Sequence, residues 1–215
     1  MTPANYKSPD VLLLVGTHCP HCPVVLAAMA DLVKAGEIGQ LEVVNIEQRP
    51  DRAAALGVRS VPWIRIGGLT LTGLHSKMEL QSWVNKAGSM EGMADYLVEM
   101  LETGQVSEAT AFVEQEPRGL DAVIHLLGDP QQKINVKVGL GVIMEGLAGS
   151  ERLQKQVPAL GVLTQSPSVE VRADACHYLG LTHSDEAKSW LEKCLDDEDQ
   201  EVREIARESL DMLEL

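Results

Sequence analysis

The sequence predicts two domains of different classes: an α/β domain over residues 1–88 and an all-α domain of helical repeats in the rest of the chain. Three observations lead to this fold class. Strand-like and helix-like segments alternate up to residue 88, every periodic segment after it is helical, and one short pattern recurs there after 31 residues. The 215 residues suffice for two domains of about 100 residues each.

Apolar runs bounded by glycine or proline predict the order β-α-β-α-β-β-α in the first domain. Gly67-Gly68 is typical of a two-residue hairpin turn, so the fourth strand should run antiparallel to the third. The predicted strands are Val11–Val15, Leu41–Ile46, Val61–Ile66 and Leu69–Thr72, and the predicted helices are Val24–Lys34, Asp51–Leu56 and Lys77–Ala87. Gly88-Ser89 then marks the predicted domain boundary.

Cys19-Pro20-His21-Cys22 stands where the first strand meets the first helix. Two cysteines separated by two residues at such a junction are typical of a redox-active dithiol, although a cytosolic Cys-x-x-Cys can also bind metal. Unpaired N–H groups at a helix N-terminus favour a thiolate, which predicts Cys19 as the nucleophile and Cys22 as the resolving thiol. Pro20 suits the first helical position, and a proton or hydrogen bond from His21 would stabilise the thiolate further.

Metal binding is the competing interpretation of this motif. His18, Cys19, His21 and Cys22 all carry ligand atoms that transition metals accept. A closed zinc site needs four ligands in a tetrahedral array, which four near-consecutive residues at one tight turn cannot supply. Because the chain has no second Cys-x-x-Cys, we predict no metal site and favour redox chemistry.

The second half of the chain carries the recurring pattern. Val171-Arg172-Ala173-Asp174-Ala175 and Val202-Arg203-Glu204-Ile205-Ala206 each follow a glutamate and a helix-breaking stretch, and Val136-Lys137-Val138-Gly139-Leu140 is a degenerate copy. Periods of 20–50 residues indicate stacked repeats, whose apolar faces are buried against their neighbours. We therefore predict helical repeats over residues 118–215, with residues 89–117 as a helical connector or cap. Cys176 and Cys194 lie on repeat helices with apolar neighbours, which favours a structural role over a regulatory disulfide.

Residues 8–88 resemble the thioredoxin/glutaredoxin family. The resemblance rests on the element order, on Cys19-Pro20-His21-Cys22 after the first strand, and on Val61-Pro62 before the third. It is closest to protein disulfide oxidoreductases of extremophiles and to the N-terminal domain of alkyl hydroperoxide reductase flavoproteins. Unlike many thioredoxins, the chain has Thr17-His18 where an aromatic residue often precedes the first cysteine, and its first strand carries no buried acid. Residues 118–215 resemble HEAT-like repeats, on the Val-Arg-x-x-Ala signature.

The resemblance implies a thioredoxin-like fold with a cis Val61–Pro62 bond that faces the cysteines. It also implies that Val61 offers backbone groups to an extended substrate peptide. The expected activity is that of a thiol-disulfide oxidoreductase without a cofactor, acting on a protein partner that the repeats select. Cys-Pro-His-Cys is also the motif of the bacterial periplasmic thiol oxidases, so the sequence leaves the direction of reaction open. Two other hypotheses remain: a non-catalytic adaptor or redox sensor, and a metal carrier.

Charge narrows the choice of partners and location. Residues 1–88 carry a net charge of +1 and residues 89–215 a net charge of −15. An acidic half repels phosphate backbones, so no nucleic-acid partner is expected; the charge serves solubility or attracts a basic partner. No apolar run approaches the roughly 20 residues of a membrane helix, and Met1–Lys7 lacks the features of a signal peptide. We therefore expect a cytoplasmic protein without a membrane partner, and the oligomeric state stays open.

Overall fold

The computed structural model describes residues 8–213. The chain divides into two compact units between Tyr96 and Leu97. This division falls inside helix α4 (Met90–Glu102), beyond the boundary predicted after Gly88. The domain limits drawn from the sequence, 1–88, 89–117 and 118–215, stay predictions.

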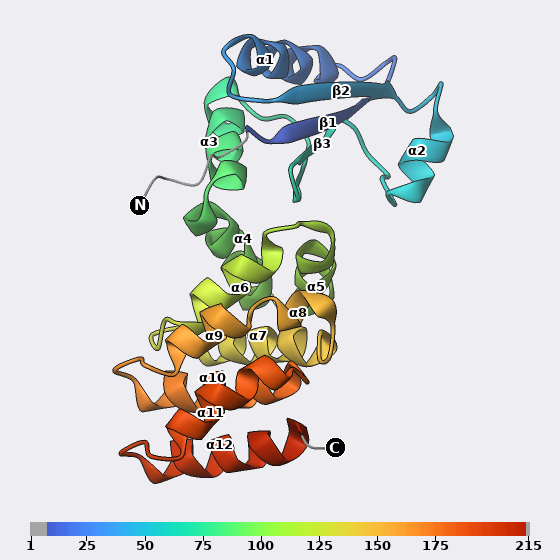
Figure 1. Cartoon of the computed structure of the whole chain (residues 1–215). Helices are drawn as coiled ribbons and strands as arrows, with labels where there is room; N and C mark the ends of the chain where they lie inside the picture. Colours follow the sequence, from blue (N-terminus) through green and yellow to red (C-terminus); the bar gives the residue numbers. More distant parts are fainter. Residues whose placement is uncertain (1–7, 214–215) are drawn as a thin grey trace. The chain divides into compact units, whose positions relative to one another are not determined.

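The first unit has the predicted order β-α-β-α-β-β-α (Figure 1). Its elements are β1 (Asp10–Val15), α1 (Cys22–Lys34), β2 (Gln40–Asn45), α2 (Pro50–Ala55), β3 (Trp63–Ile66), β4 (Leu69–Thr72) and α3 (Lys77–Gly88). The strands form one mixed sheet in the order β2-β1-β3-β4. Strand β1 pairs with β2 in parallel, and the β1–β3 and β3–β4 pairs are antiparallel, which confirms the predicted hairpin.

Both faces of the sheet are buried at β1, whose central residues are all apolar. Val11 and Leu13 face α1 and α3, where they share one buried cluster with residues such as Met29 and Leu80. Leu12 and Leu14 face the other way and pack with Trp63 in a second cluster. Burial on both faces explains why β1 appears in the sequence as a continuous apolar run instead of an alternating one. It also fixes the loop that follows β1 at the edge of a rigid core.

The second unit is helical throughout its described part. After α4 come α5 (Val106–Gln115), α6 (Gly119–Leu127), α7 (Ile134–Gly146), α8 (Glu151–Gln154), α9 (Val157–Leu163), α10 (Val169–Leu181), the 3₁₀ turn η1 (Asp185–Ala187), α11 (Lys188–Cys194) and α12 (Gln200–Leu213). Figure 1 shows the later helices of this unit stacked in successive layers. Layers of this kind bury the apolar side of each helix against the next one, as repeat architectures do.

The recurring sequence pattern corresponds to one structural position. Its valines, Val136, Val171 and Val202, lie near the starts of α7, α10 and α12, and all three are buried. The residues one helical turn later are buried too, namely Leu140, Ala175 and Ala206. Positions i and i+4 share one face of a helix, so the degenerate copy in α7 presents the same face as the two clear copies.

In the two clear copies of the repeat pattern, the arginine joins its helix to the preceding turn by a hydrogen bond. The guanidinium of Arg172 donates to the Ser166 carbonyl (3.1 Å), and that of Arg203 donates to the Asp197 carbonyl (2.6 Å). Both bonds reach six residues back along the chain. Arg172 also forms a bidentate pair with Asp197 at 2.8 Å, with both side chains about nine-tenths buried. The pair lowers the pKa of the Asp197 carboxyl, chiefly through the hydrogen bond from Arg172.

The expectations about location stay predictions. Among residues 8–213, no helix combines the length and the apolar character needed to cross a membrane. The N-terminal residues 1–7, on which the expectation about a signal peptide rests, lie outside the described residues.

Candidate redox site

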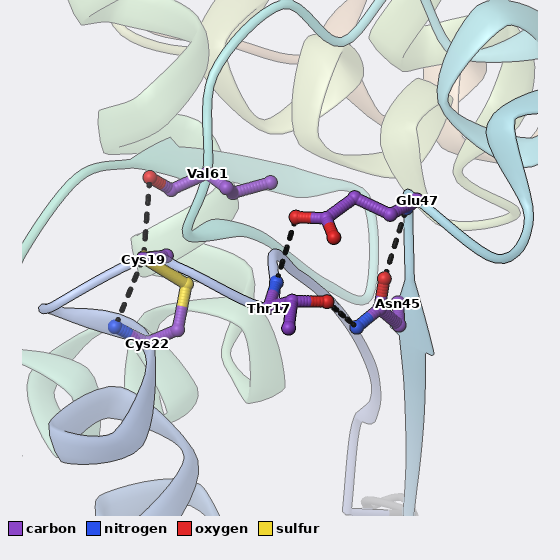
Figure 2. Close-up of a disulfide and its surroundings, with 6 residues drawn as sticks. All are labelled: Thr17, Cys19, Cys22, Asn45, Glu47 and Val61. Carbon is purple, nitrogen blue, oxygen red and sulfur yellow. Dashed lines mark hydrogen bonds between the residues drawn. A yellow bond between two sulfur atoms is a disulfide. The ribbon is translucent and has the colours of Figure 1, made fainter.

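Cys19 and Cys22 are joined in a disulfide at the start of α1, with their Cα atoms 5.5 Å apart (Figure 2). Cys19 belongs to the loop that leaves β1, and Cys22 is the first residue of the helix. The buried strand therefore sets the position of one cysteine and the helix that of the other. The backbone N–H of Cys22 donates to Sγ of Cys19 at 3.1 Å. This N–H belongs to a helix N-terminus, where a thiolate finds unpaired donors and the favourable end of the helix dipole.

The two cysteines differ in their access to solvent. Cys22 is 4% exposed and packs toward the core, whereas Cys19 is partly exposed. A substrate disulfide can therefore reach Cys19 more readily than Cys22. This asymmetry agrees with the predicted roles of Cys19 as nucleophile and Cys22 as resolving thiol, which stay predictions.

Helix α1 begins earlier than the sequence suggested and places its proline differently. Its first residue is Cys22 instead of Val24, and His21 is the N-cap. The prediction that Pro20 occupies the first helical position was wrong, because the first helical hydrogen bond runs from the N–H of Val25 to the carbonyl of His21. Pro23 is the proline of the first turn, where its missing N–H costs no helical bond.

The side chains between the cysteines point to no partner within the described chain. Pro20 and His21 are both exposed. No hydrogen bond joins the His21 ring to Cys19 among residues 8–213, so an effect of His21 on the thiolate remains a prediction.

Val61 and Pro62 lie beside the disulfide, and the peptide bond between them is cis, as the resemblance implied. The carbonyl oxygen of Val61 is 3.7 Å from Sγ of Cys19. In the reduced protein, a Cys19 thiol could donate to this oxygen. The carbonyl of Pro62 accepts from the N–H of Gly73 at 2.9 Å, which ties this segment to the end of β4. Cys19, Val61 and Pro62 thus come together from two separate stretches of chain.

A polar cluster that the sequence analysis did not identify borders the site. Figure 2 shows Thr17, two residues before Cys19, with hydrogen bonds to both Asn45 and Glu47. The Glu47 carboxylate accepts from the N–H of Thr17 at 2.9 Å, and the Asn45 amide donates to the Thr17 hydroxyl at 3.0 Å. The hydrogen bonds from Thr17 lower the pKa of Glu47, so this carboxylate is ionised at neutral pH.

The signal for this cluster lay in the topology. Strands β1 and β2 are parallel, and Val15 pairs with Asn45. The ends of parallel neighbours lie at the same edge of a sheet, so residues just after β2 meet the residues just after β1. Polar residues at 45 and 47 become candidates only once β1 and β2 are known to be neighbours.

The cysteines of the second unit form a separate, buried pair. Cys176 is fully buried and Cys194 is 4% exposed. The thiol of Cys194 donates to the Trp190 carbonyl (3.3 Å), and contact with Cys194 together with burial raises the pKa of Cys176. Two buried thiols with internal partners fit the structural role that the sequence favoured. Within residues 8–213, no three His, Cys, Asp or Glu side chains lie close enough together to hold a metal ion.

Comparison with known families covers most of both units. A family model of the thioredoxin domain matches residues 10–85, which include the cysteines and the cis proline. A family model of HEAT repeats matches residues 120–211, which include all three copies of the recurring pattern. A search among curated proteins finds no match to the chain.

Proposed function

We propose that this chain, a thioredoxin-like domain followed by HEAT repeats, is a thiol-disulfide oxidoreductase that acts on a protein substrate through Cys19 and Cys22. The observation that carries the proposal is the placement of this cysteine pair at the N-terminus of α1. A partly exposed Cys19 there accepts a hydrogen bond from the N–H of Cys22 at 3.1 Å.

The exchange proceeds in two balanced steps. The Cys19 thiolate attacks one sulfur of a substrate disulfide, a Cys19–substrate bond forms, and the second substrate sulfur leaves as a thiolate that takes up a proton. The Cys22 thiolate then attacks Sγ of Cys19 and releases the first substrate sulfur. The substrate gains two electrons and two protons, and Cys19–Cys22 ends as the disulfide. The same steps in reverse oxidise a substrate dithiol.

The helix N-terminus and the Cys22 N–H would stabilise the Cys19 thiolate in both directions. A stabilised Cys19 thiolate is a good leaving group when the Cys19–Cys22 disulfide is opened, so it favours the reduced dithiol and hence an oxidising couple. The reducing poise of the cytoplasm would instead keep the pair as a dithiol. Measurement of the equilibrium between the Cys19–Cys22 pair and a defined thiol would therefore decide the direction of the reaction.

The cis Val61–Pro62 segment supports the proposal that the substrate binds as an extended peptide. The Val61 carbonyl lies 3.7 Å from the reactive sulfur, where an extended peptide bound by backbone hydrogen bonds would bring its own cysteine next to Cys19. Apolar side chains flank this segment and the cysteines: Val24, in the first turn of α1, and Leu74, next to Gly73, are each more than half exposed. Exposed apolar groups at such a place suit contact with a protein substrate.

The repeats would choose the substrate protein. HEAT repeats generally mediate protein–protein interaction, because stacked helices present an extended surface. In this arrangement the repeats supply affinity for one partner, and the thioredoxin-like domain performs the exchange.

Trapping of the mixed disulfide tests this function. In the Cys22→Ser variant the second step is blocked, so Cys19 should accumulate disulfide-linked protein that reducing agent releases. The unmodified chain should reduce insulin with dithiothreitol as the electron source, and Cys19→Ser should do neither. Absence of both mixed disulfides and insulin reduction would leave an adaptor, in which Cys19→Ala preserves the cellular role.

A further inference from the structure

We infer that Glu47 is a positioning residue of the redox site, which holds the loop carrying Cys19 through a hydrogen bond to the backbone of Thr17. The inference deepens the proposed function and rests on it. It gives a role to a carboxylate that has no hydrogen bond to either cysteine.

Thr17 is held by two neighbouring residues at the end of β2. The Glu47 carboxylate accepts from its N–H at 2.9 Å, and the Asn45 amide donates to its hydroxyl at 3.0 Å (Figure 2). The N–H of Glu47 in turn donates to the Asn45 side-chain oxygen at 2.9 Å. The side chain of Thr17 is thus bonded to the last residue of β2 and its backbone to the segment just after β2, and β2 is itself paired with β1.

Thr17 determines where Cys19 lies because the loop between them is short and tight. The N–H of Cys19 donates to the Gly16 carbonyl at 3.3 Å, which closes a turn around Thr17. A Cβ on Gly16 would come within 3.1 Å of a Val61 methyl group, so the turn lies directly against the cis-proline segment. A shift of Thr17 would therefore change the distances from Sγ of Cys19 to the Cys22 N–H and the Val61 carbonyl.

The hydrogen bond and the charge of Glu47 act on Cys19 in opposite directions. The hydrogen bond between Glu47 and the Thr17 N–H holds the loop so that Sγ of Cys19 stays within reach of the Cys22 N–H. The Cys22 N–H in turn stabilises the Cys19 thiolate. The negative charge of Glu47 disfavours a second negative charge on the sulfur of Cys19. Alanine removes both effects, whereas glutamine removes the charge and keeps an oxygen that accepts from Thr17. The comparison of Glu47→Ala with Glu47→Gln therefore isolates the hydrogen bond.

The test is the pH dependence of Cys19 alkylation by iodoacetamide in the full-length chain carrying Cys22→Ser. This background keeps the Cys22 backbone N–H, and peptide mass spectrometry identifies the modified thiol. His18 and His21, the other titratable groups of the loop, are the same in every variant. We expect the pKa of Cys19 to be higher in Glu47→Ala than in Glu47→Gln by about 0.5, as the loss of one modest hydrogen bond predicts.

Two further variants sharpen the test. Asn45→Ala removes the second hold on Thr17 and should also raise the pKa of Cys19. Asp129→Ala removes a bond of the same kind in the second unit, where the Asp129 carboxylate accepts from the N–H of Gln131 at 2.9 Å. It should leave the pKa of Cys19 unchanged.

Equal pKa values in Glu47→Ala and Glu47→Gln, with both variants folded by thermal unfolding, overturn the inference. If Glu47→Ala does not fold, Asn45→Ala decides, and an unchanged Cys19 pKa in that variant rejects the inference. Alkylation requires no substrate disulfide. A chain that fails to exchange disulfides therefore rejects the proposed function alone, while equal alkylation profiles reject only the role of Glu47.

Discussion

Cys19 and Cys22 share one short motif but occupy different environments. Cys19 is partly exposed and accepts the N–H at the helix N-terminus, whereas Cys22 is 4% exposed beneath it. Two chemically identical side chains thus lie in different environments, and this difference is the basis of the roles proposed for them.

This difference predicts unequal reactivity of the two thiols. Cys19 in the Cys22→Ser variant should react with iodoacetamide at pH 7 at least about tenfold faster than Cys22 in the Cys19→Ser variant, because its thiolate is stabilised and accessible. Alkylation rates of the two reduced single-cysteine variants, followed by mass spectrometry, check this. Equal rates would contradict the assignment of Cys19 as the nucleophile.

The sequence alone predicted the residues of the site that lie in a local motif. Cys19 and Cys22 follow from their spacing, and the cis bond at Pro62 follows from the family resemblance. Glu47 and Asn45 could not be predicted, because their contact with Thr17 depends on the parallel pairing of β1 with β2. Such a pairing is a long-range property that no local pattern contains.

At the scale of elements, the repeats contain a buried ion pair between Arg172 of α10 and Asp197, in the turn before α12. Arg172 also donates to the Ser166 carbonyl, so one guanidinium joins its own helix to two turns. The pattern Val-Arg-x-x-Ala therefore combines a buried apolar face with a polar attachment for the preceding turn.

Removal of the buried carboxylate should destabilise the repeats strongly. Asp197→Ala leaves the Arg172 guanidinium buried without its partner, which costs about 3 kcal/mol of unfolding free energy. Asp185→Ala is the matched control, since its pair with Lys188 is exposed and should contribute little. Chemical denaturation of the three proteins measures the difference, and equal losses in both variants would contradict the role of burial.

The same pair predicts how this stability depends on pH. Arg172 lowers the pKa of Asp197 in the folded chain, so Asp197 stabilises the fold wherever it is ionised in both states, above about pH 4. The contribution is lost as the pH falls from there through the lowered pKa. The free-energy gap between the unmodified chain and Asp197→Ala should be constant from about pH 5 to 7 and shrink below about pH 4. A gap that persists unchanged in acid would contradict the ionic origin.

Element boundaries show where sequence reasoning stops at this scale. The positions of glycine and proline in the sequence predicted the strands and helices of the first unit. Helix α1, however, begins at Cys22 instead of Val24. The start of a helix depends on which carbonyl accepts the first helical hydrogen bond, here that of His21, and neither Pro20 nor Pro23 reveals this.

At the scale of the whole molecule, a nearly neutral first half is joined to a strongly acidic second half. Periodicity in the sequence predicted the two classes of domain because helical periodicity and repeat spacing extend over many residues. Composition did not predict the division between Tyr96 and Leu97, since α4 runs across it without a break.

If the repeats select the substrate, a substitution on their surface should change the exchange with protein substrates and leave the exchange with small thiols unchanged. Val138, on α7, is 60% exposed and lies one turn from Ile134, which is exposed as well. Val138→Glu in the Cys22→Ser background should change which proteins are trapped on Cys19, with little effect on stability at so exposed a position. Exchange of the Val138→Glu chain with glutathione should be unchanged. An identical set of trapped proteins would argue against selection by this face.

A redox titration of the Cys19–Cys22 pair against glutathione tests the central claim most directly. Quenched samples are alkylated at a series of thiol-to-disulfide ratios, and mass spectrometry reports the state of both cysteines. The account predicts one reversible two-electron transition in which Cys19 and Cys22 are protected and released together. Cysteines that stay reduced or oxidised over the whole range, or that titrate independently, would contradict a dithiol/disulfide centre.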